Sequence, residues 1–89
     1  MEMENIMDTV IVSTINALAN GMSKSWIDQD FIKEFKRITG WTVDVENIHG
    51  VHKAAKKALK ATKNLRLGWT TEHVVVLMLE FAARLKVEW

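Results

Sequence analysis

Residues 74–85 read VVVLMLEFAARL, an apolar run that only Glu80 and Arg84 interrupt. A segment that is apolar on nearly every side forms a helix in the centre of a core or in an oligomer interface. Thr70 suits the N-cap position of this helix, and Trp69 can pack on its first turn as a hydrophobic staple. The run therefore predicts a helix around which the rest of the chain packs.

Three further helices are expected before this run. Apolar residues recur at helical spacing over residues 4–19, and Asn20 and Gly21 then predict a left-handed C-terminal cap. A second helix is expected to begin after Ser25, its N-cap, and to end at Gly40. The expected apolar faces are Met7, Ile11, Ile15 and Leu18 in the first helix, and Ile27, Phe31, Phe35 and Ile38 in the second.

Residues 41–45 alternate apolar and polar side chains, which is typical of a strand, and residues 85–89 show a similar alternation. A minor two-stranded ribbon between them is one alternative, and a helix that begins at Asp44 is another. We favour an extended linker, followed by a third helix over residues 47–67 that Gly68 caps.

The composition limits the class of protein. The chain has 89 residues, of which 48% are hydrophobic and 26% charged, and it has no cysteine. These values predict one ordered domain over residues 1–89, without disulfides or thiolate chemistry. No run approaches the roughly 20 apolar residues of a membrane span, and the acidic start is unlike a signal peptide. We therefore expect a cytoplasmic, all-α, compact four-helix domain with a central apolar C-terminal helix.

A basic stretch follows the linker. Residues 48–71 contain no acidic residue and carry a net charge of +6, whereas residues 1–47 carry −4 and residues 72–89 carry −1. Most of the basic residues recur at helical spacing and so line one side of the third helix, while Ala55 and Ala58 lie on the side expected to pack on the C-terminal helix. The basic residues are Lys53, Lys56, Lys57, Lys60, Lys63 and Arg66.

A basic side of this kind can bind an anionic partner, or it can keep the surface solvated. The leading hypothesis is a non-enzymatic regulatory protein that acts by protein–protein binding and associates with itself, because the C-terminal helix is apolar all round. The alternative is a nucleic-acid-binding regulator that contacts phosphates through the segment Lys53–Arg66. The single arginine of this segment and the net charge of +1 favour the first hypothesis.

The four tryptophans lie at expected helix starts, in the linker or at the last position. Trp26, Trp41 and Trp69 are interpreted as staples or lids over the core, and the alternative is that a tryptophan stacks on bases or anchors a partner. Trp89 either packs back on the core or binds a partner, and we include it among the partner-binding residues because tryptophan is enriched among the residues that dominate binding energy.

No motif predicts catalysis or metal binding. His49 and His52 form a His-x-x-His pair behind Glu46, but a zinc site needs three or four ligands and a di-iron site needs a second Glu-x-x-His motif. The chain also lacks a phosphate-binding glycine loop, a Gly-x-Ser-x-Gly elbow and a Cys/His pair. We predict that the protein is not an enzyme and that it uses no metal, cofactor or small-molecule substrate.

Overall fold

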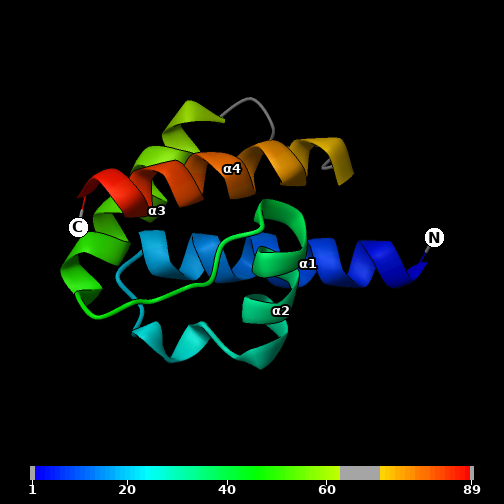
Figure 1. The fold of residues 1–89 in the computed structure, drawn as a ribbon, viewed down its shortest axis with the longest axis horizontal. Coiled ribbons are helices and arrows are strands. Elements are labelled where there is room, and N and C mark those ends of the chain that lie inside the picture. The colour runs from blue at the N-terminus through cyan, green and yellow to red at the C-terminus, as the bar shows by residue number, and fades with distance from the viewer. Residues whose placement is uncertain (1, 63–70, 89) are drawn as a thin grey trace.

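The structure is a computed structural model that describes the backbone of residues 2–62 and 71–88 and the side chains of residues 9–62 and 72–86. Within these residues the chain forms helices and no strand (Figure 1). In chain order the elements are α1 (Glu2–Ala19), the short 3-10 helix η1 (Lys24–Trp26), α2 (Gln29–Thr39), α3 (Ile48–Ala61) and α4 (Thr71–Glu88). The prediction of a compact all-α four-helix domain is confirmed.

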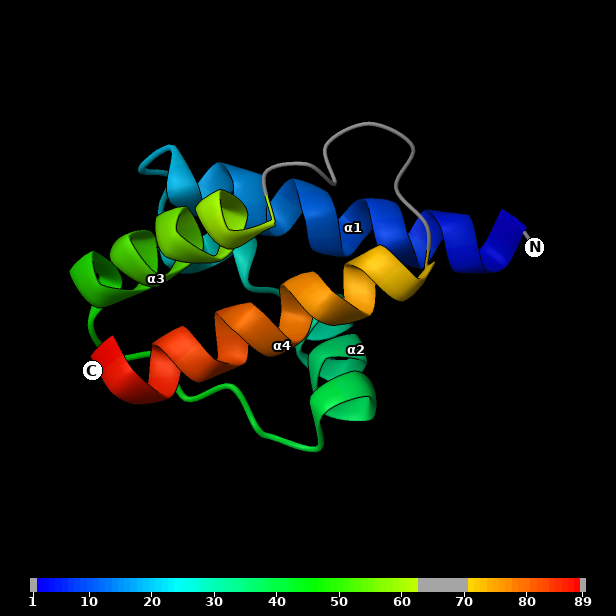
Figure 2. The same ribbon diagram turned by 90° about the horizontal axis from the view of Figure 1, so that it is seen from above.

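Helix α4 packs against each of the other three helices, as its apolar sequence predicts (Figures 1 and 2). Its most extensive interface is with α3. Val76 and Leu79 nevertheless remain 42% and 48% exposed, so one strip of this helix faces outward. Its buried residues are Val74, Leu77, Met78, Phe81, Ala82 and Leu85.

Three phenylalanines hold α2 against α4. The rings of Phe31 and Phe35, one turn apart on α2, have centroids 5.6 Å apart. The Phe81 ring of α4 meets both of them edge-on, at 6.3 Å and 6.0 Å. All three side chains are at most 1% exposed. Edge-to-face packing of buried rings adds to the hydrophobic gain, so this cluster fixes α2 on the core.

Glycines end α1 and α2 where the sequence predicts. Gly21 has a φ of 87°, and the Met22 N–H donates to the Ala17 carbonyl at 3.0 Å, as in a Schellman motif. Gly40 ends α2 with a φ of 78°. Of the predicted apolar faces, Ile11, Ile15, Leu18, Phe31 and Phe35 are buried, Ile27 and Ile38 are half-buried, and Met7 lies outside the described side chains.

The start of α2 differs from the prediction. Ser25, the predicted N-cap, lies inside η1, where its N–H donates to the Ser23 hydroxyl at 3.2 Å. Asp28 is the N-cap of α2, and its Oδ1 accepts from the Phe31 N–H at 2.9 Å. Both residue types can cap, and aspartate has the further advantage of a negative charge at the positive end of the helix dipole.

The linker prediction is confirmed, since residues 41–47 form neither helix nor strand. The two-stranded ribbon is wrong because residues 85–88 continue α4, and the start at Asp44 is wrong because Asn47 is the N-cap of α3. The described part of α3 ends at Ala61, short of the predicted end at residue 67. The predicted caps Gly68 and Thr70 and the staple Trp69 lie outside the described residues.

Replacement of Phe81 by alanine tests the importance of the phenylalanine cluster. Because it removes the ring shared by α2 and α4, Phe81→Ala is expected to lower the free energy of unfolding by about 3–5 kcal/mol. Leu79→Ala, on the exposed strip of the same helix, is expected to change it by no more than about 0.5 kcal/mol. Urea denaturation followed by circular dichroism measures both, and equal losses would contradict this description of the core.

The capping assignment makes a second prediction. Asp28→Ala is expected to cost about 1 kcal/mol because the Phe31 N–H loses its acceptor. Ser25→Ala removes only the exposed hydrogen bond between the hydroxyls of Ser23 and Ser25, and it is expected to cost less than about 0.5 kcal/mol. Thermal unfolding of the two variants compares them directly, and a larger loss for Ser25→Ala would restore the prediction made from sequence.

Candidate functional site

The small residues of α3 decide where its lysines lie. Val51, Ala54, Ala55 and Ala58 are fully buried, and α3 packs on both α1 and α4. Alanine side chains allow helices to approach closely. The lysines between these positions therefore point to solvent. This confirms the predicted orientation of α3, in which Ala55 and Ala58 lie on the packing side.

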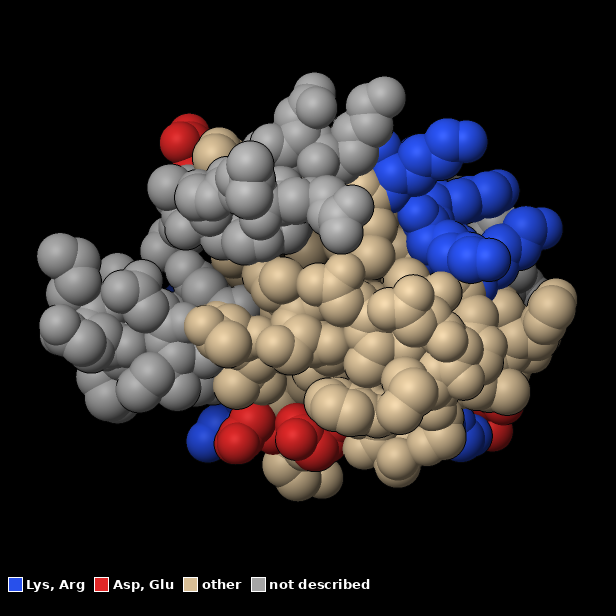
Figure 3. Space-filling view, turned by 180° about the vertical axis from the view of Figure 1, so that it is seen from behind, with Lys and Arg blue, Asp and Glu red and all other residues tan. Residues whose placement is uncertain are grey.

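We call the exposed side of α3 the basic face; its described members are Lys53, Lys56, Lys57 and Lys60. Figure 3 shows a cluster of lysine and arginine side chains at the upper right of the view with no acidic side chain among them, whereas the other basic side chains in this view lie along the lower edge beside acidic ones. Two other members of the predicted set, Lys63 and Arg66, lie outside the described residues, as does Trp89.

Two open hollows flank the basic face. The first, of about 540 Å³, lies between α3 and the turn after α1, and the second, of about 480 Å³, lies between α3 and α4. Arg84 of α4 borders the second hollow, so the positive surface extends to a second helix. The first hollow is lined by Ala19, Asn20, Gly21, His49, His52, Lys53 and Lys56, and the second by Lys57, Lys60, Ala61 and Arg84.

The sequence did not predict the role of Arg84. Its guanidinium lies 3.5 Å from the Glu80 carboxylate, one helical turn earlier. The spacing of these two residues predicts that ion pair. It contains no signal for the approach of α3, because that depends on the packing of the helices.

His52 makes a hydrogen bond between two parts of the fold. The ring Nε2 of His52 lies 2.7 Å from the Met22 carbonyl, to which it donates, and this contact ties α3 to the turn after α1. His49 is exposed at the start of α3. Within the described part of the chain, no three histidine or carboxylate side chains are placed to share a metal ion.

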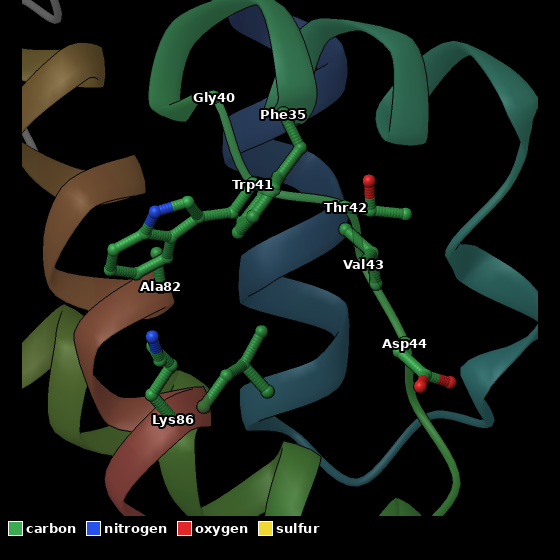
Figure 4. Close-up of a pocket in the computed structure, with 9 residues that line it drawn as sticks. Phe35, Gly40, Trp41, Thr42, Val43, Asp44, Ala82 and Lys86 are labelled. Atoms are coloured by element: carbon green, nitrogen blue, oxygen red, sulfur yellow. The ribbon is translucent and has the colours of Figure 1, made fainter.

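An open groove of about 510 Å³ lies between the linker and α4 (Figure 4). Trp41 reaches from the linker towards α4, where the Lys86 ammonium lies 4.9 Å from the centroid of the indole ring, a cation–π contact. The groove is lined by Phe35, Gly40, Trp41, Thr42, Val43, Asp44, Ala82, Leu85 and Lys86. No sequence pattern links Trp41 to Lys86, which are far apart in the chain.

The lid interpretation of the tryptophans is wrong for the two that are described. Trp26 and Trp41 are each 42% exposed, which is too open for a lid over the core. Trp26 belongs to η1, outside the core cluster, and Trp41 forms one end of the groove. Exposed tryptophans of this kind are available for contact with a partner.

The described helices include none that is both long enough and apolar enough to cross a bilayer. No protein-family model, no curated protein and no solved structure matches this chain.

Proposed function

We propose that the protein is a non-enzymatic interaction module that associates with further copies of itself, with its basic face bound to acidic residues of a neighbouring copy. The observation that carries the proposal is the concentration of lysine on one side of α3. Lys56 and Lys60 make no hydrogen bond or ion pair with any described residue. Their charges are thus available to a partner.

The chain itself contains a complementary surface charge. Outside residues 48–71 its net charge is −5, from −4 in residues 1–47 and −1 in residues 72–89. The first two turns of α1 contain Glu2, Glu4 and Asp8 and no basic residue. This end of α1 extends past the other helices, on the opposite side of the molecule from α3 (Figure 2). Opposite charges at opposite ends favour head-to-tail contact.

The dimensions of the two charged segments agree. At a rise of about 1.5 Å per residue, the described basic face from Lys53 to Lys60 and the acidic start of α1 each extend about 10 Å. A contact between them is heterologous, because it joins different surfaces of two copies. Copies therefore add in series, as open chains or as a closed ring, and need no two-fold axis.

Nucleic acid is the competing anionic partner, and three observations disfavour it. The described basic face contains lysine only, whereas arginine is the preferred residue for bidentate recognition of phosphates and bases. Arg84 at its edge is already paired with Glu80. The net charge of the whole chain is only +1, whereas a domain dedicated to nucleic-acid binding is usually much more basic.

Charge reversal on both surfaces tests self-association. The variant Lys56→Glu/Lys60→Glu and the variant Glu2→Lys/Glu4→Lys are each expected to sediment as monomers under low-salt conditions where the unchanged chain forms larger species. A mixture of the two is expected to associate again, because the intact surfaces of the two variants are complementary and their two reversed surfaces also carry opposite charges. Lys33→Glu/Lys36→Glu, on α2, is the control and is expected to associate like the unchanged chain.

A second measurement separates the two partner classes. The unchanged chain is expected to show less than about a tenfold change in affinity for duplex DNA or RNA between 50 mM and 200 mM salt, because few phosphate contacts form. A steeper salt dependence that Lys56→Glu and Lys60→Glu abolish would support nucleic-acid binding instead. A strict monomer at high protein concentration in the sedimentation experiment would rule out self-association.

A further inference from the structure

The linker between α2 and α3 has the side-chain pattern of a strand without a strand beside it. Val43 and Val45 are half-buried and pack against the core, whereas Thr42, Asp44 and Glu46 are exposed. This alternation is the period of two that defines a strand with one buried face. The alternation in the sequence therefore corresponds to alternating burial of the side chains along the linker.

The backbone of this segment is also unpaired. Among the described residues, no backbone–backbone hydrogen bond involves residues 42–46. Within the described part of the chain, their one hydrogen bond is at the Val45 carbonyl, which accepts from the Lys24 ammonium at 3.4 Å. An extended segment with free N–H and C=O groups is a template for pairing with another chain.

The Lys24 contact identifies which edge is free. In an extended backbone, successive residues direct their N–H and C=O groups to opposite edges. The Val45 carbonyl points to the edge that faces Lys24, so the groups of Thr42, Asp44 and Glu46 point to the other edge. The groove lies between the linker and α4, which forms its opposite wall (Figure 4).

The apolar part of the groove and the exposed carboxylates of the linker indicate the chemistry of a partner, while Lys86 of the groove lining is held over the Trp41 ring. A chain laid along the free edge would direct every second side chain inward, towards the apolar groups of Phe35, Ala82 and Leu85. The intervening side chains would lie on the same outer face as Asp44 and Glu46. Opposite charges in directly facing positions of paired strands are stabilising.

We propose that residues 42–46 accept an extended peptide as an added β-strand, and that the peptide alternates apolar residues with lysine or arginine. The backbone supplies the hydrogen bonds, and the groove beside Trp41 receives an apolar side chain. This surface is distinct from the basic face, so the proposal does not depend on self-association through α3.

The test uses the full chain, labelled with ¹⁵N, and a short end-capped peptide of alternating lysine and valine. Binding is expected to slow the hydrogen exchange of the Thr42, Asp44 and Glu46 amides, and to leave those of Val43 and Val45 unprotected. This alternation distinguishes strand addition from general contact with the linker, which would protect both sets alike.

Two peptide controls leave the protein unchanged. A peptide with the same lysines and valines in two blocks is expected to bind at least about tenfold more weakly, because it cannot place valines inward and lysines opposite the carboxylates at alternate positions. An alternating peptide with methylated backbone nitrogens is expected to bind at least about tenfold more weakly, because each lost hydrogen bond costs about this factor. Equal binding by the block peptide, or no protection of the three amides, would overturn the proposal. So would an absence of binding by the alternating peptide.

Two protein variants complete the experiment. Asp44→Lys places a positive charge opposite the peptide lysines and is expected to weaken binding by about tenfold, while Asp44→Asn should have a smaller effect. Lys56→Glu/Lys60→Glu is expected to bind the peptide at least as well as the unchanged chain. A loss of peptide binding in that variant would assign the interaction to the basic face and contradict strand addition.

Discussion

The contact of Phe81 with Phe31 and Phe35 is the constraint on which the rest of the structure depends. It holds α2 against α4, and the end of α2 lies apart from the start of α3 (Figure 1). Residues 41–47 must bridge that separation. At about 3.3 Å per extended residue they can cover roughly 20 Å, which a helical segment of the same length cannot. The unpaired linker and the groove beside it therefore follow from the position of one aromatic cluster.

The basic face has a different origin. Because the side chains of Ala54, Ala55 and Ala58 are small, α3 can pack closely on both α1 and α4. The lysines between these alanines are therefore directed to solvent. Burying a lysine ammonium without a partner of opposite charge would cost much more free energy than leaving it in water. The same packing brings Arg84 to the edge of the lysines, so one close helix contact sets both the core and the charged surface.

The basic face and the linker edge differ in how far the amino-acid sequence predicts them. Helical spacing predicts the basic face, because the order of lysine and alanine is itself the pattern. The alternation of residues 41–45 was interpreted correctly as strand-like and wrongly as half of a ribbon, because α4 continues through the residues that would have paired with it. The all-round apolar character of α4 suggested a central helix or an oligomer interface. Most of its described apolar side chains are buried against the other three helices, and among them Val76 and Leu79 are largely exposed.

Two single-residue predictions, the N-cap Ser25 and the lid Trp41, were wrong for reasons that lie in the neighbouring structure. Ser25 and Asp28 are both good capping residues, and their choice depends on where the chain enters α2, which η1 sets. Trp41 could be a lid or a surface residue, and the choice depends on how far α4 lies from the linker.

The sequence by itself determined the number of helices, the glycine ends of α1 and α2, the buried faces and the side of α3 that carries lysine. These features depend on side-chain spacing and on backbone preferences within a few residues. Only the tertiary structure decided that Arg84 joins the lysines, that Trp41 meets Lys86, and that the linker keeps a free backbone edge beside a groove. Those features arise from contacts between distant segments, and no local pattern contains the distances that separate them.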